Sequence, residues 1–253
     1  MGYVKDTVQR QFGHVAFNYS VSPVHAAGVD LDLMLSAVEL TDTQRVLDAG
    51  CGAGHASFAF APHVAQVIAY DLTQNMLEQV NRLALDKNIH NIEAKVGDVE
   101  NLPFEDASFD LVVSRLSAHH WPHPQAALAE FARVLKPNGY FVLSDTVSPS
   151  DPVLDTFLQT VELLRDVSHV RDHTVMQWTT LLSNTGFVSE VIHNWEIPLE
   201  FQSWVDRIAT PEPNIAMIKM LFDQAPHEVR NVMNVQLDHS FNIQAALFRA
   251  RKN

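Results

Sequence analysis

The chain contains a single cysteine, Cys51, among its 253 residues. One thiol cannot form an intrachain disulfide, and it cannot supply the several thiolates of a zinc or iron–sulfur centre. Disulfide scaffolds and thiolate-held metal centres are therefore excluded. Because a protein without disulfides suits a reducing compartment, we expect a cytoplasmic location.

Long apolar runs and basic runs are also missing. No segment approaches the ~20 apolar residues of a membrane-spanning helix, and residues 1–20 hold no apolar stretch suited to a signal peptide. The formal net charge is -13, and no cluster of lysine and arginine reverses it locally, so the surface repels phosphate backbones. We therefore expect neither a membrane span nor a nucleic-acid partner.

The first half of the chain alternates short apolar segments with amphipathic ones. This alternation predicts a doubly wound α/β fold, in which helices cover both faces of a mostly parallel sheet. Gly139 is expected to form the left-handed turn between the last helix and strand of this half. The predicted strands are 46–50, 67–71, 92–96, 109–114 and 140–144, and the predicted helices are 57–64, 74–87 and 125–135.

The second half is less regular, and prolines punctuate it without forming a polar linker. The predicted elements are helices at 151–168 and 174–185, a strand at 187–197, helix across 200–236, and a strand at 241–250. We therefore expect one domain, 1–253, rather than two. Its predicted parts are N-terminal helices and a lid (1–40), a core (41–147), cap insertions (148–173 and 198–238) and a final strand (241–250).

A glycine-rich turn, with Gly50, Gly52 and Gly54 at alternate positions, follows the first predicted strand. Glycines at such a turn let the backbone bend tightly and contact a ligand, although a purely structural turn has the same appearance. Asp71 ends the second predicted strand, at the spacing of a carboxylate that binds ribose hydroxyls. Together these features predict a site for a cofactor that contains ribose.

The spacing of the glycines separates two candidate cofactors. Dinucleotide-binding turns usually read GxGxxG and face a pyrophosphate, whereas this turn reads GxGxG and has Asp48 two residues before it. A carboxylate at that position repels a pyrophosphate and attracts an ammonium or sulfonium group. Charge therefore favours S-adenosylmethionine (SAM) over NAD.

Four ordered blocks carry a family resemblance: VLDAGCGAGHAS, AYDLTQNML, VGDVENLPFEDASFDLVVSR and FARVLKPNGYFVLSD. The chain resembles the class I SAM-dependent methyltransferases, particularly the small-molecule branch that includes ubiquinone and menaquinone biosynthesis enzymes. Segments such as SRLSAHHW and DPVLDTF resemble uncharacterised bacterial members. The resemblance implies a Rossmann-like seven-stranded sheet of order 3-2-1-4-5-7-6 with its last strand antiparallel, SAM as cofactor and S-adenosylhomocysteine as product. It leaves the acceptor open, because members methylate carbon, oxygen and nitrogen.

The resemblance also implies which residues bind the methionine end of the cofactor. Asp48, Gly50 and Gly52 would face the methionine moiety, in a turn that Gly54 completes. Ser114 would line the side of the sulfonium.

At the adenosine end, the resemblance assigns Asp71 and Leu72 to the ribose and the adenine edge, and Met76 to the adenine face. Asp98 would accept a hydrogen bond from the adenine amino group, beside the Val99 backbone. Ordinary core packing is the alternative for Leu72 and Met76, and a turn-forming role is the alternative for Asp98.

The segment SRLSAHHWPHP follows the fourth predicted strand, at the sheet edge where ligands of α/β proteins bind. His119 is the first candidate for a catalytic base and His120 the second, because histidine titrates near neutral pH. Either could instead be a hydrogen-bonded structural residue. A metal site that uses His123 with these two is disfavoured, since no carboxylate pattern accompanies it, and no metal is expected.

Five residues are candidates for the acceptor side of the site: Tyr19, Trp121, His169, Arg171 and His173. The last three could equally form a hydrogen-bonded loop cluster. Five further aromatic residues could wall the acceptor or belong to the core: Trp178, Trp195, Phe201, Trp204 and Phe241.

These features predict methyl transfer by in-line SN2 attack to a small, hydrophobic or aromatic metabolite. For such a reaction the protein mainly has to align the acceptor and exclude water. One alternative is a SAM-binding sensor or partner subunit without catalysis. Another, disfavoured by the glycine spacing and Asp48, is a nucleotide-dependent oxidoreductase. A homodimer is compatible with either enzyme.

Overall fold

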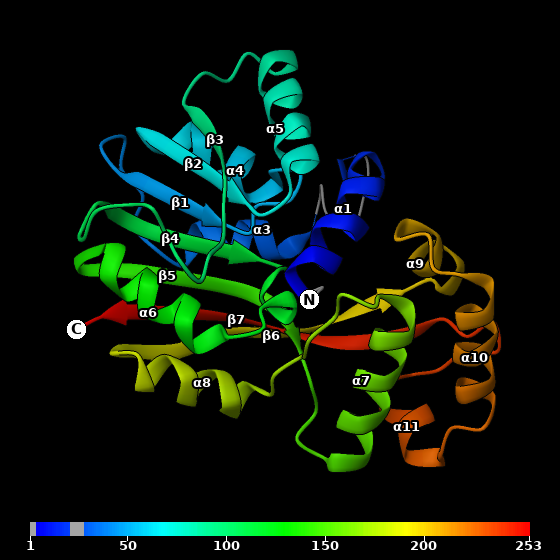
Figure 1. Ribbon diagram of the computed structural model, residues 1–253. Coiled ribbons are helices and arrows are strands. Elements are labelled where there is room, and N and C mark those ends of the chain that lie inside the picture. Colours follow the sequence, from blue (N-terminus) through cyan, green and yellow to red (C-terminus); the bar gives the residue numbers. More distant parts are fainter. Residues whose placement is uncertain (1–3, 21–27) are drawn as a thin grey trace.

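The computed structural model describes residues 4–20 and 28–253, without the side chains of residues 17–20. Part of the expected lid, residues 1–3 and 21–27, thus lies outside the described residues. A seven-stranded sheet forms the centre of the molecule and helices lie on both of its faces (Figure 1). Within the described ranges, no helix has the length and apolar character needed to cross a membrane.

The sheet has the order β3-β2-β1-β4-β5-β7-β6. β7 pairs antiparallel with both β5 and β6, whereas the other strand pairs are parallel, and the order that the family resemblance implied is confirmed. The strands are β1 (Arg45–Ala49), β2 (Gln66–Asp71), β3 (Ile92–Val96), β4 (Phe109–Arg115), β5 (Leu135–Val147), β6 (Phe187–Leu199) and β7 (Phe241–Lys252).

Helices cover both faces because successive residues of the central strands are apolar. Val46 and Leu47 of β1 point to opposite faces, and both are fully buried. Val46 packs in a cluster with α3 (Val29–Ser36) and α4 (His55–Phe60). Leu47 packs in a second cluster with α6 (Pro124–Val134) and α8 (Val175–Asn184). Burial of the central strands on both sides agrees with the predicted sheet that helices cover on both faces.

One turn differs from the prediction. β5 begins at Leu135, directly after α6, and Asn138 rather than Gly139 adopts the left-handed conformation, with φ of 63°. A Cβ on Gly139 would lie 3.0 Å from the carbonyl oxygens of Asp110 and Lys136. The glycine is therefore needed for close backbone approach, and the prediction of a left-handed Gly139 was wrong.

Four helices form a cap with its own apolar cluster: α7 (Pro152–Arg165), α9 (Phe201–Arg207), α10 (Glu212–Asp223) and α11 (His227–Val232). The helix predicted across 200–236 is divided into three, because Pro211 and Pro226 cannot continue a helix and each begins the next one. Figure 1 shows the cap on the side where β4 ends, and α1 (Val4–Ser20) lies on the same side. α5 (Gln74–Asp86) packs between α1 and the β2–β3 edge.

The apolar cluster of the cap predicts how much stability the protein loses when one aromatic ring is removed from it. Phe222 of α10 is fully buried and contacts the rings of Phe157, Phe201 and Phe241. We expect Phe222→Ala to lower the free energy of unfolding by about 3 to 5 kcal/mol, as measured by urea denaturation. Met220→Ala, on the exposed side of the same helix, is the control and should cost less than about 0.5 kcal/mol. Equal effects of the two variants would show that the cap has no packed core.

Candidate active site

The glycine turn after β1 is left-handed at three positions. The φ angles are 72° at Gly50, 52° at Gly52 and 89° at Gly54. Residues other than glycine adopt such positive φ angles only at a cost in free energy. A Cβ on Gly50 would lie 2.0 Å from the hydroxyl oxygen of Ser117. A Cβ on Gly52 would meet no described atom within 4 Å, because Gly52 borders an open cavity at the carboxyl ends of β1, β2 and β4.

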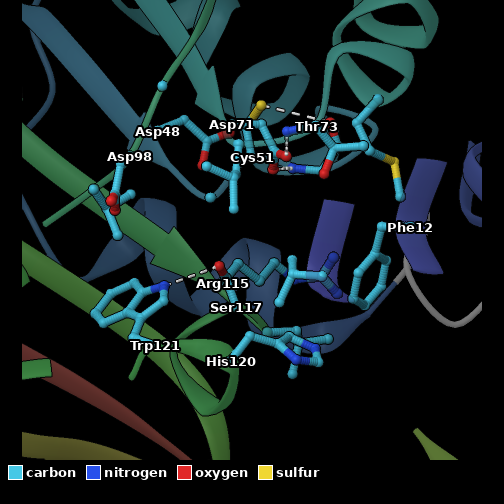
Figure 2. Close-up of a pocket in the computed structure, with 18 of the residues that line it drawn as sticks. Phe12, Asp48, Cys51, Asp71, Thr73, Asp98, Arg115, Ser117, His120 and Trp121 are labelled. Atoms are coloured by element: carbon cyan, nitrogen blue, oxygen red, sulfur yellow. Dashed lines mark hydrogen bonds between the residues drawn. The ribbon is translucent and has the colours of Figure 1, made fainter. Parts of the chain in front are cut away.

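Asp71 ties this turn to the neighbouring strand. Its Oδ2 accepts a hydrogen bond from the Gly52 backbone N–H at 2.8 Å, and its Oδ1 accepts one from the Thr73 N–H at 2.8 Å. Burial raises the pKa of the Asp71 carboxyl, and these two hydrogen bonds oppose the rise. The carboxylate therefore lies on the cavity wall in a fixed orientation, as Figure 2 shows.

Asp48, at the end of β1, lies beside the same cavity and is fully buried. Its Oδ2 accepts a hydrogen bond from the Ser57 hydroxyl at 2.6 Å, whereas its Oδ1 has no hydrogen-bond partner among the described residues. Burial raises the pKa of Asp48 to about 6, and the nearby Asp71 contributes to the rise. A buried carboxylate oxygen without a donor is costly, so Asp48 Oδ1 is suited to a donor that a ligand brings.

Helix α1 closes one side of the cavity, and Lys5 in its first turn was not predicted. The Lys5 Nζ lies 2.5 Å from both Asp98 Oδ2 and Glu100 Oε2. Burial alone would lower the pKa of Lys5, but the two carboxylates outweigh it and raise the pKa. Asp98, which was predicted to accept a hydrogen bond from the adenine amino group, is therefore already paired with the Lys5 ammonium. An adenine amino group would have to bind beside that ammonium or displace it.

The remaining predicted cofactor residues divide into two groups. Leu72, Met76 and Val99 border the cavity, as Gly50 does, whereas Gly54 packs against Val80 and Phe58. Ser114 is fully buried behind the wall, where its hydroxyl donates to the Ala49 carbonyl at 2.7 Å. The next residue along β4, Arg115, borders the cavity in its place.

A second cavity opens beside the first and shares Phe12, Leu116 and His120 with it. Its lining mixes apolar and polar residues, and the cap supplies residues of both kinds. The apolar residues are Ile197, Leu199, Trp204 and Ile243, and the polar residues are His119, Thr146, Glu162, Arg165, Asp172 and Arg207.

His119 borders the second cavity and is held by a buried carboxylate. Its Nδ1–H donates to Asp145 Oδ1 at 2.7 Å. Burial opposes the charge on the ring, but Asp145 outweighs burial and raises the pKa of His119 to about 9. The ring is therefore an imidazolium at neutral pH.

His120 lies between the two cavities, with its ring edge to face with Phe12 at a centroid separation of 4.9 Å (Figure 2). Its Nδ1 donates to the Ser168 carbonyl at 3.1 Å, so Nε2 carries the lone pair of the neutral ring. Burial and the adjacent charge on His119 lower the pKa of His120 to about 3. The two neighbouring histidines thus differ in charge at neutral pH.

Among the described residues, the other predicted acceptor residues do not border either cavity, except for Trp121. His169 bonds Gln159 at 3.0 Å, Arg171 bonds Asp155 at 2.5 Å, and His173 packs on Trp178. Trp121 is the exception, because it borders the first cavity and donates from Nε1 to the Ser117 hydroxyl at 3.3 Å. The side chain of Tyr19 lies outside the described residues.

Trp204 is the member of the predicted aromatic wall that reaches the second cavity. Trp178, Phe201 and Phe241 are buried in the apolar clusters, and Trp195 packs partly buried on one of them. Within the described ranges, no three histidine, cysteine or acidic side chains are grouped so that they could hold a metal ion.

Comparison with known proteins places this geometry in a family. Residues 47–143 match the family model of a methyltransferase domain. The chain is 36% identical to the uncharacterised methyltransferase YcgJ of Bacillus subtilis over 97% of its own length and 99% of that protein. The crystal structure of YcgJ superposes with a TM-score of 0.86 over 88% of this chain and 97% of the other. The chain belongs to the class I SAM-dependent methyltransferases.

Two further relatives of this methyltransferase illustrate how far the similarity extends. The uncharacterised protein YafE of Escherichia coli is 41% identical over 80% of this chain and 98% of its own. A demethylmenaquinone methyltransferase of Staphylococcus saprophyticus is 35% identical over 47% of this chain and 52% of its own. The similarity to the menaquinone enzyme therefore covers about half of each protein.

The residues of the methyltransferase cavity fit the cofactor that the family uses. Asp48 Oδ1 and the Thr73 hydroxyl are buried polar atoms without a partner among the described residues, and both border the cavity. An ammonium or sulfonium group suits the first and a hydroxyl or amine suits the second. Gly52 leaves the space that a side chain would otherwise fill. These residues could therefore hold SAM.

The raised pKa of Asp48 predicts that SAM binding depends on pH. A cationic ligand favours the ionised carboxylate, so the affinity should be complete well above pH 6 and should fall by up to about tenfold per pH unit below it. Calorimetric titration with SAM between pH 5 and pH 8 measures this slope. Asp48→Asn should bind more weakly at pH 8 and show a flatter profile. An Asp48→Asn profile that is parallel to the wild-type profile would contradict the assignment.

Proposed function

We propose that the protein transfers a methyl group from SAM to a small acceptor with a hydrophobic or aromatic body, bound in the second cavity. The observation that carries this proposal is the junction of the two cavities at Phe12, Leu116 and His120. When bound, SAM supplies a methyl group that its sulfonium already activates. An acceptor on the other side of the junction would then lie within reach of that methyl group.

The mixed lining of the second cavity suits an acceptor that has an apolar body and a polar group. Ile197, Leu199 and Trp204 can bury an apolar or ring-bearing body, which the aqueous phase disfavours. His119 and the buried acids Glu162 and Asp172 line the same cavity, and they can orient a hydroxyl or other polar group. The relation to a menaquinone-pathway enzyme supports a ring-bearing acceptor.

His119 and His120 take different roles in this proposal. The His119 imidazolium, fixed by Asp145, stabilises negative charge on the acceptor oxygen or carbon that becomes the nucleophile. His120 is neutral and borders both cavities, and Asp166 Oδ2 lies 3.9 Å from its Nε2. Because a pKa of about 3 makes the ring a weak base, Nε2 receives the acceptor's proton only as the bond to the methyl group forms and makes that proton strongly acidic. The role of base thus passes to the second candidate of the sequence analysis.

The cap completes the site by excluding water. Residues of α7 and α9 form part of the second cavity, and Gln11 of α1 donates to the Ile208 carbonyl, next to α9, at 2.6 Å. This contact joins the helix over the cofactor cavity to the cap over the acceptor cavity. Exclusion of water strengthens the charge interactions of His119 with an acceptor.

The proposed roles predict a distinct pH dependence of methyl transfer. Because His119 is protonated below its pKa of about 9, transfer should be constant from neutral pH and should fall as the pH rises through about 9. Transfer of label from SAM to a panel of phenols and quinols, and to a metabolite extract, measures the rate. His120→Asn should lower the rate by about 10²-fold at most, because a base with a pKa of about 3 contributes at the low end of general-base catalysis. His119→Asn should remove the alkaline limb.

Two results would change the proposal. A rate that climbs through pH 9 would make His119, rather than His120, the base. Label that reaches no compound in the panel or the extract, although SAM binds, would favour a SAM-binding sensor or partner subunit. His173→Asn is the control, since this histidine packs on Trp178 away from both cavities, and it should leave the rate unchanged.

A further inference from the structure

Arg115 is a charged residue of the cofactor cavity whose role the proposed function leaves open. It ends β4 and is 9% exposed, yet it borders the cavity. Its Nε donates to Asp30 Oδ2 at 2.5 Å and its Nη2 donates to Asp30 Oδ1 at 2.9 Å. Asp30, on α3, also accepts a hydrogen bond from the Ser144 hydroxyl at 3.1 Å. The two-point bond to Asp30 fixes the plane of the guanidinium.

The charges around the cavity are unevenly distributed. Four carboxylates border it, those of Asp48, Asp71, Asp98 and Glu100, while its lysine and arginine side chains are Lys5 and Arg115. Lys5 is bonded to Asp98 and Glu100. In Figure 2, Asp98 lies at one side of the cavity, and the Arg115 side chain extends toward Phe12 at the other. Arg115 therefore marks the end of the cavity opposite to Asp98.

The amino-acid end of SAM carries both an ammonium and a carboxylate. The ammonium suits the unpartnered Asp48 Oδ1, but four carboxylates in one cavity would repel the carboxylate of the ligand unless a cation lies beside it. Arg115 lies close enough to Asp48 for its charge to lower the pKa of that carboxyl, against the upward effect of burial. A guanidinium is suited to a carboxylate, because its planar set of N–H donors matches the two carboxylate oxygens.

We infer that Arg115 binds the α-carboxylate of the cofactor's methionine moiety, and that Asp30 positions the guanidinium for this contact. The inference rests on the proposed use of SAM and adds a specificity-determining residue to it. Asp48 and Arg115 together then form a two-ended clamp for an amino-acid group. Such a clamp selects SAM over decarboxylated SAM, which keeps the sulfonium and the ammonium but lacks the carboxylate.

The test is a comparison of these two ligands by calorimetry, with binding rather than turnover as the readout. The wild-type protein should bind SAM at least about tenfold more tightly than decarboxylated SAM, as expected for a charge-assisted hydrogen bond. The double variant Asp30→Asn/Arg115→Gln avoids a stranded buried charge, and it should lose this preference while its affinity for decarboxylated SAM changes little. Arg133→Gln, which removes an arginine outside the cavity, is the control and should keep the wild-type preference.

The outcomes separate this inference from the proposed function. Two results would show that Arg115 does not hold the carboxylate, provided that SAM binds. The double variant would keep the preference for SAM over decarboxylated SAM, or the wild-type protein would show no such preference. Neither result affects the methyltransferase assignment. If neither SAM nor S-adenosylhomocysteine binds the wild-type protein, the use of SAM itself is wrong. Should circular dichroism show that the double variant is unfolded, Arg115→Lys replaces it, because it keeps the charge beside Asp30. This variant should lose part of the preference, and a full wild-type preference in it would overturn the inference.

Discussion

The hydrogen bond between the Gly52 backbone and Asp71 is the interaction around which the rest of the site is arranged. It links the left-handed turn after β1 to the end of β2, so that Asp48 and Asp71 border one cavity. A second bond, from the Gly50 N–H to the Tyr70 carbonyl at 2.8 Å, repeats the link two residues earlier in the same turn. Helix α1, the Asp30–Arg115 pair and the cap all meet at this edge of the sheet.

Buried charge is organised differently in the two cavities. The first is bordered by Asp48 and Asp71, and burial raises the pKa of both carboxyl groups. In the second, Asp145 keeps one proton on His119, whereas burial and the adjacent charge on His119 keep His120 neutral. The two neighbouring rings therefore differ in charge, which suits transfer between the cavities because they can act on one acceptor in opposite senses.

The central strands of the sheet could be predicted because each contains a run of successive apolar residues, such as Val46 and Leu47. Such a run is typical of a strand that is buried on both faces. The residues of the glycine turn are consecutive in the chain, so their grouping was also predictable, and eight of the ten predicted cofactor residues border the cavity. Lys5, Arg115 and Asp145 escaped prediction because their partners, Asp98, Asp30 and His119, lie 93, 85 and 26 residues away in the chain. Contacts of that separation depend on how α1, α3 and β5 pack, which local patterns do not encode.

The central claim is that a glycine-rich turn, between the carboxylates of Asp48 and Asp71, selects a cationic adenosyl compound rather than a dinucleotide. Calorimetric titration of the wild-type protein with SAM and with NADH under the same conditions tests it most directly. The account predicts one saturable site for SAM and no heat of binding for NADH. Saturable binding of NADH together with no binding of SAM would contradict it.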